Sequence, residues 1–170
     1  MLAYTAIGSL DGYIADPSVD FSWAAPSEEV HLAVNAIERR VSTMVLGRRT
    51  YEVLTVWETM DTSGEPPAMQ EFQALWLAAD KVVVSRTLES VPTARTTIAR
   101  ELPPLDGPSS IGGPTLAAEA FARGLVDEVH LFLAPVTVGA GLPALPAGLR
   151  LELVGHQVFP GGWVGLTYRP

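Results

Sequence analysis

The chain has 170 residues, carries a formal net charge of −8 and is 48% apolar. This length and apolar content suffice for the core of one domain, and they exclude a disordered or collagen-like chain. Because Lys81 is the only lysine among 11 basic residues, a broad basic face for nucleic acid or anionic lipid is also excluded.

Cysteine is absent, so the chain has no disulfides and no thiolate ligands, and its three histidines stand far apart in the sequence. We therefore expect no metal site. The first residues lack the basic and apolar regions of a secretory signal, and no apolar run is long enough to cross a bilayer. We expect a cytoplasmic protein with no membrane partner and no nucleic-acid partner.

Strands and helices alternate along the first two thirds of the chain. Short β-branched and apolar runs predict buried strands at residues 2–7, 43–46, 81–85, 96–99 and 110–111. Helical spacing and start signals predict a helix after an N-cap at Ser27, a short helix around residues 51–54, one at residues 68–79 and one from Pro114 to near Gly124. This alternation predicts an α/β fold with a mixed, mostly parallel sheet flanked by helices on both faces.

The last third of the chain predicts antiparallel strands. Residues 129–138 read as one long strand that Pro135 breaks or bulges. Residues 149–158 and 163–168 read as a C-terminal hairpin across two glycines. We expect a single domain over residues 1–170.

Two loops that follow predicted strands have the composition of phosphate sites. Residues 46–50 combine a glycine, two arginines and a helix start, and residues 112–115 place two glycines before another helix. Each glycine taken alone is equally well explained as a turn or cap residue. Since ligands bind at the carboxyl ends of parallel strands, the two loops together with residues 85–86 predict one ligand with several phosphates.

Residues 139–144 match the pattern G-x-G-x-x-A after a strand, but Pro143 and Pro146 prevent the helix that a dinucleotide fingerprint needs. This excludes a Rossmann fold. Gly139 and Gly141 are then expected to let the backbone pass close to a ligand or to another strand.

Two acids are candidates for proton chemistry or ligand contact. Glu28 stands one residue into a helix, shortly after Trp23, where a carboxyl beside an aromatic wall could relay a proton. The helix dipole alone also favours an acid in a first turn. Asp11 either orients a ligand or caps the turn that it forms with Gly12.

Several motifs in chain order resemble the dihydrofolate-reductase-like superfamily. They are residues 9–15 (SLDGYIA), 46–52 (LGRRTYE), 84–86 (VSR), 112–116 (GGPTL) and 127–131 (DEVHL), followed by Pro135 and residues 139–141. Within this superfamily the chain is similar to stand-alone relatives of the carboxy-terminal reductase domain of the bifunctional riboflavin-biosynthesis deaminase-reductase. The resemblance covers nearly the whole chain. It implies a three-layer fold with an eight-stranded sheet and NADPH across the carboxyl edge of that sheet.

The resemblance also implies a role for each matched residue. Residues implied to border the nicotinamide are Ala6, Ile7, Ser9 and Ile14. Those implied to hold the phosphates and the adenosine ribose are Gly47, Arg48, Arg49, Thr50, Ser85, Arg86, Gly112, Gly113, Pro114, Thr115 and Leu116. Substrate contacts are assigned to Trp23, Tyr51, Gly139 and Gly141, and catalysis to Glu28 and Asp11.

The function implied is an NADPH-dependent reductase that transfers hydride to a small heterocyclic or carbonyl/imine substrate. Arg86 favours NADPH over NADH, because a guanidinium beside the ribose pairs with a 2′-phosphate. The chain lacks the arginine that folate reductases place just before residues 82–84, and it has Tyr13 where riboflavin reductases have a basic residue. Dihydrofolate reductase and a non-catalytic nucleotide-binding module are the alternatives. Relatives dimerise through their carboxy-terminal strands, so we expect a homodimer.

Overall fold

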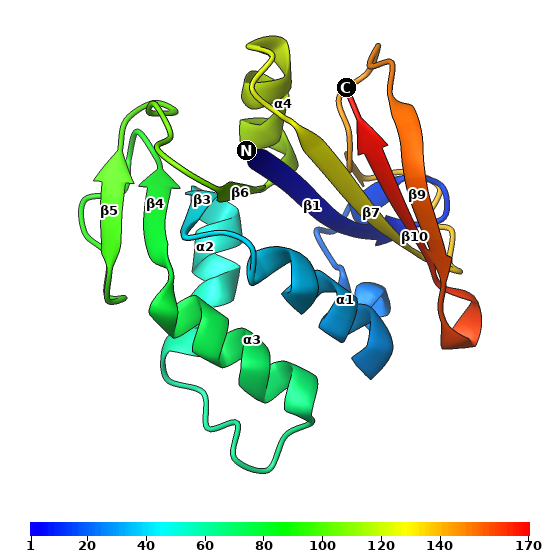
Figure 1. Ribbon diagram of the computed structural model, residues 1–170, viewed down its shortest axis with the longest axis horizontal. Helices are drawn as coiled ribbons and strands as arrows, with labels where there is room; N and C mark the ends of the chain where they lie inside the picture. Colours follow the sequence, from blue (N-terminus) through cyan, green and yellow to red (C-terminus); the bar gives the residue numbers. More distant parts are fainter.

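A mixed sheet of eight strands runs through the centre of the computed structural model, which describes residues 1–170 (Figure 1). From one edge to the other, the strands are β5 (Thr96–Ala99), β4 (Asp80–Val84), β3 (Thr43–Gly47), β6 (Ser109–Gly112), β1 (Leu2–Ser9), β7 (Glu128–Ala134), β10 (Val164–Arg169) and β9 (Glu152–Val158). The first six are mutually parallel, and β10 is antiparallel to both β7 and β9. The predicted fold class is confirmed.

Helices cover both faces of this sheet. Helix α4 (Pro114–Ala122) packs on the face that carries Tyr4 and Val45. Helix α1 (Glu28–Glu38) packs on the opposite face, against Ala3 and Phe132. Helices α2 (Arg48–Leu54) and α3 (Pro67–Ala78) lie on the α1 side, where they enclose the buried side chain of Trp76. No helix is both long enough and apolar enough to cross a membrane.

Local sequence signals explain where the helices begin. The Ser27 hydroxyl accepts a hydrogen bond from the Val30 amide at 3.4 Å, as an N-cap does. Pro114 is the first residue of α4, where a missing N–H costs nothing. The predicted starts of these two helices are therefore confirmed, and α4 ends at Ala122, two residues before Gly124.

The strand predicted at residues 129–138 is shorter than expected. Strand β7 ends at Ala134, because Pro135 has no N–H to donate to the ladder. The expectation that a broken or bulged strand continues to Val138 is wrong. Beyond Pro135 the chain forms a loop that reaches β8 (Leu142–Pro143), which pairs with β2 (Tyr13–Ala15) in a small separate sheet. This β2–β8 pair was not predicted.

Candidate functional site

The loops that follow β3 and β6 meet because these strands are parallel neighbours, with Leu46 opposite Gly112. A Cβ atom on Gly112 would lie 2.9 Å from Leu46 Cδ2, and one on Gly113 would lie 2.7 Å from Thr50 Oγ1. Gly113 also has a φ of +97°, which side chains rarely tolerate. Thr50 therefore fits over this turn only because both positions are glycine, and the two predicted phosphate segments form one surface.

Two helices begin at this surface. Helix α4 begins directly after Gly113, and no side chain caps its first turn. Helix α2 likewise begins after Gly47 without a side-chain cap. The amides of a first turn have no partner within the helix, and the helix dipole makes that end positive. The surface can thus bind an anionic group.

Exposed arginines follow the two neighbouring strands β3 and β4. Arg48 and Arg49 open α2, and Arg86 follows β4. Arg48 donates a hydrogen bond to Thr87 Oγ1 at 3.3 Å, which ties α2 to the loop that carries Arg86. The side of the site formed by α2 and this loop is therefore positively charged.

Ser85 shapes the turn that exposes Arg86. Its buried hydroxyl accepts hydrogen bonds from the amides of Thr87 at 3.3 Å and Leu88 at 3.0 Å. Arg100 donates to the carbonyls of Ser85 and Leu88 at 2.9 and 2.8 Å. Arg100 was not predicted as part of the site. A basic residue directly after β5, at the carboxyl ends of the parallel strands, could have indicated it.

The side implied to border the nicotinamide is built from β1 and β2. Ala6 is buried and Ile7 is half-buried on β1, and Ile14 packs against the core from β2. Ser9 is fully buried, and its hydroxyl accepts from the Tyr13 amide at 3.0 Å. This bond holds the chain reversal between the two strands.

Asp11 stands in that reversal and connects two loops. Its carboxylate accepts hydrogen bonds from Ser9 Oγ at 2.6 Å, from the Gly139 amide at 2.7 Å and from the Val138 amide at 3.2 Å. The hydrogen bond from Ser9, followed by those from the two amides, holds the pKa of Asp11 below its usual range. Asp11 therefore stays ionised at neutral pH, and it is not a proton donor.

Glu28 is exposed at the first position of α1, beyond the Ser27 cap. Trp23 is half-buried, packs against the core beneath α1 and donates its indole N–H to the Asp20 carbonyl at 3.2 Å. A proton relay through Glu28 and a substrate contact of Trp23 stay predictions.

Tyr51 requires a correction. Only 2% of this residue is exposed, its ring stacks on Trp76, and its hydroxyl lies 2.8 Å from Thr93 Oγ1. Tyr51 is thus a core residue that offers no surface to a substrate. The Tyr51 side chain points inward because this face of α2 packs between the sheet and α3.

The two glycines of the G-x-G-x-x-A segment also have structural explanations. A Cβ atom on Gly141 would lie 2.0 Å from the Ala15 carbonyl oxygen, so here the backbone passes close to another strand. Gly139 has a φ of +78°, and its amide binds Asp11. Contact of either glycine with a substrate stays a prediction.

Charge is distributed unevenly across the site. Residues 1–38 contain no Lys or Arg, and their acids are Asp11, Asp16, Asp20, Glu28, Glu29 and Glu38. Hydrogen bonds from Ser18 and the Asp20 amide hold the pKa of Asp16 low, so this carboxyl is ionised. Burial lowers the pKa of His31, so this imidazole is neutral at pH 7. The segment from β1 to the start of α1 therefore carries acids and no basic residue, whereas Arg48, Arg49 and Arg86 follow β3 and β4.

Comparison with known proteins finds related sequences over nearly the whole chain. The model of the RibD C-terminal domain family matches residues 1–105 and 110–165. The uncharacterized protein YyaP of Bacillus subtilis (strain 168) is 24% identical over 94% of this chain and 89% of its own length.

Solved structures share the fold at low sequence identity. A Shewanella sp. PV-4 protein, whose name links it to riboflavin biosynthesis, superposes with a TM-score of 0.73 at 20% identity, over 99% of this chain and 98% of that protein. The deaminase and 5-amino-6-(5-phosphoribosylamino)uracil reductase of Thermotoga maritima gives a TM-score of 0.68 at 17% identity. That match covers 100% of this chain and 56% of the Thermotoga protein. With a family match over nearly its whole length, the chain belongs to the RibD C-terminal domain family of reductase-like proteins.

Proposed function

We propose that the protein is an NADPH-dependent reductase that passes hydride to a small heterocyclic or carbonyl/imine substrate. The observation that carries this proposal is the joint surface of the two glycine turns. Thr50 packs so closely over Gly113 that a Cβ atom there would lie 2.7 Å from its Oγ1, and a Cβ atom on Gly112 would lie 2.9 Å from Leu46 Cδ2. Such a close backbone approach, next to uncapped helix starts, suits a pyrophosphate.

The residues present fit the whole nucleotide. Residues 112–116 and Thr50 would hold the pyrophosphate, Arg48 and Arg49 would pair with phosphate oxygens, and Arg86 would pair with the 2′-phosphate. NADPH supplies the hydride when it is bound. Ala6, near the carboxyl end of β1, would then border the nicotinamide, and Ile7 faces the α1 side of the sheet.

The cofactor assignment is tested with Arg86→Ala. Loss of a charge-assisted pair with the 2′-phosphate should weaken NADPH binding roughly 10- to 100-fold. NADH, which has no 2′-phosphate, should be little affected. Quenching of tryptophan fluorescence measures both affinities. Arg95→Ala is the matched control. Arg95 precedes β5, at the amino ends of the parallel strands, whereas Arg86 follows β4 at their carboxyl ends, and Arg95 pairs with Asp80 at 2.9 Å. Equal loss of NADPH and NADH affinity in Arg86→Ala would contradict the assignment.

The charge distribution limits which charged groups a substrate of this site can carry. The Thermotoga protein is a reductase of a phosphoribosylamino-uracil, whereas the substrate side of this chain has no basic residue within residues 1–38. We therefore propose a substrate without a phosphate group on that side, because ionised Asp11 would repel it.

Oxidation of NADPH, followed by its absorbance, tests the substrate. The dephosphorylated ribosylamino-uracil should react faster than its 5′-phosphate, and a clear preference for the phosphate would refute the charge argument. Turnover of dihydrofolate would instead identify a folate reductase. Tight NADPH binding without turnover of any such compound would identify a nucleotide-binding module.

A further inference from the structure

Two loops that are distant in sequence form one unit at the edge of the site. The first is residues 9–12, between β1 and β2, and the second is residues 135–141, between β7 and β8. Leu10 donates its amide to the Val136 carbonyl at 2.7 Å, and Ala144 donates its amide to the Gly12 carbonyl at 2.9 Å. Both strands that the loops extend, β1 and β7, are parallel neighbours, so the loops leave the sheet at the same edge.

Asp11 makes the central connection between these loops. The Val138 amide lies 3.2 Å from both carboxylate oxygens, and the Gly139 amide lies 2.7 Å from Oδ2. The buried hydroxyl of Ser9 donates to Oδ1 at 2.6 Å. One side chain thus accepts from three donors, which only an ionised carboxylate with two oxygens can do well.

This arrangement does not belong to the core. Asp11 is exposed, whereas the neighbouring Ser9 is fully buried. The Gly139 backbone, with its φ of +78°, turns successive amides toward the carboxylate. The Asp11 contacts therefore lie outside the core, and they add to the backbone hydrogen bonds that join the same two loops.

We propose that Asp11 is a positioning residue that clasps residues 135–141 onto residues 9–12 and thereby holds the β1–β2 wall of the nucleotide site in place. The clasp itself follows from the contacts above. Its effect on the nucleotide rests on the proposed function. In this role Asp11 acts through the backbone of both loops and transfers no proton.

Asp16, which follows β2 and makes none of the contacts between the two loops, provides a matched control. Asp16 is also an acid with hydrogen bonds to backbone amides, at 2.8 Å from Ser18 and 2.9 Å from Asp20, and to the Ser18 hydroxyl at 2.7 Å. All of its partners lie within four residues, so it joins no distant segments. Asp11→Asn and Asp16→Asn therefore remove the same charge and similar contacts, but only Asp11→Asn opens the clasp.

Amide hydrogen exchange of the full chain, resolved at residues 136–141, tests the clasp without any substrate. Exchange of the Val138 and Gly139 amides should be about tenfold faster in Asp11→Asn than in Asp16→Asn. Asp11→Glu, which keeps a carboxylate, should recover part of the protection. Exchange that is equal in the two Asn variants would overturn the clasp.

NADPH affinity, measured by quenching of tryptophan fluorescence on the same variants, tests the positioning role. We expect several-fold weaker binding in Asp11→Asn, recovery in Asp11→Glu and no change in Asp16→Asn. Faster exchange with unchanged NADPH affinity would overturn positioning and leave the clasp as a purely structural contact. If the unchanged protein binds no nucleotide, the proposed function and this positioning role fail, while hydrogen exchange still decides on the clasp.

Discussion

At the scale of single residues, Gly113 is the position where the site depends most on a missing side chain. A methyl group there would lie 2.7 Å from Thr50 Oγ1, and the backbone φ is +97°. Gly113→Ala should lower the free energy of unfolding by about 1–3 kcal/mol, since a non-glycine residue in this conformation is strained. It should also weaken NADPH binding, because Thr50 must move. Urea unfolding and fluorescence titration measure the two effects.

Gly124→Ala is the matched control for this prediction. Gly124 also has a positive φ, of +63°, but a Cβ atom there meets nothing within 4 Å. In Gly124→Ala the free energy of unfolding should fall only by the left-handed penalty of about 1–2 kcal/mol. The NADPH affinity should not change. If the two alanine variants bind NADPH equally well, Thr50 does not control the phosphate surface.

At the scale of elements, β9 is an edge strand with apolar side chains in solvent. Leu153, Val154 and Val158 are 51%, 45% and 72% exposed. An uncovered edge of this kind can pair with another chain, so we propose that β9 forms the interface of a homodimer. Sedimentation velocity at micromolar concentration should show the dimer mass.

Val158→Lys should convert this dimer to a monomer, because a charge at the edge would be buried on pairing. Leu77→Lys changes an exposed apolar residue on α3 and should remain dimeric. A monomer in the unchanged protein would refute the interface.

Elements with strong local signals could be predicted from the sequence. Strand β5 has the predicted bounds, and α1 starts where Ser27 predicts. The β2–β8 pair could not be predicted, because strands of three and two residues show no periodicity and their pairing joins distant segments. Lys81 was placed at the border of β4, yet it is 1% exposed, with its ammonium donating to the carbonyls of Trp76 and Ala79.

The candidate site was predictable in its parts and not in its assembly. The glycines and arginines after β3, β4 and β6 stand in recognisable local patterns. That Thr50 closes over Gly113 depends on β6 lying beside β3, and strand order leaves no local signal. Tyr51 stands within the motif of residues 46–52 and was assigned to the substrate with it. Its burial depends on the packing of α2 against α3, which the motif does not indicate.

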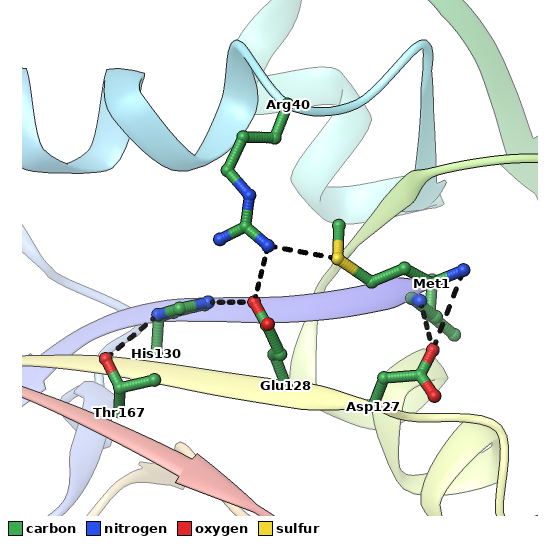
Figure 2. A network of polar contacts seen from close by, with 7 residues as sticks. Met1, Arg40, Asp127, Glu128, His130 and Thr167 are labelled. Carbon is green, nitrogen blue, oxygen red and sulfur yellow. Dashed lines mark hydrogen bonds and ion pairs between the residues drawn. The ribbon is translucent and has the colours of Figure 1, made fainter. Parts of the chain in front are cut away.

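At the scale of the whole molecule, a polar network joins the segment after α1 to the sheet (Figure 2). His130 on β7 lies 3.2 Å from Glu128 Oε2 and 3.3 Å from Thr167 Oγ1 on β10. Arg40 also contacts Glu128, at 3.0 Å. Burial lowers the pKa of His130, although Glu128 partly opposes this effect. The imidazole is therefore neutral in the folded protein at pH 7.

This network predicts how stability depends on pH. In the unfolded chain His130 binds a proton at its ordinary pKa of 6.5, but in the folded protein it does so only at lower pH. Its contribution is therefore complete above pH 6.5 and is lost as the pH falls below that value. His130→Gln should flatten the fall in the free energy of unfolding between about pH 7 and pH 5.

Burial raises the pKa of Glu38, so this residue makes the free energy of unfolding fall as the pH rises, opposite to the effect of His130. The contribution of His130 is therefore isolated by comparing two His→Gln variants. His156→Gln, at an exposed position on β9, should keep the slope of the unchanged protein. Urea unfolding at each pH measures the slopes. Identical slopes for His130→Gln and His156→Gln would show that the buried imidazole does not control acid stability.

The position of β6 between β1 and β3 has a consequence for folding kinetics. Strand β1 pairs only with β6 and β7, both from the second half of the chain, so central pairings form between segments that are distant in sequence. Contacts of this range close slowly. We expect the phosphate surface, which needs β3 and β6 side by side, to assemble late in folding. Bound nucleotide should then slow unfolding far more than it speeds folding, because the folding transition state lacks its binding site.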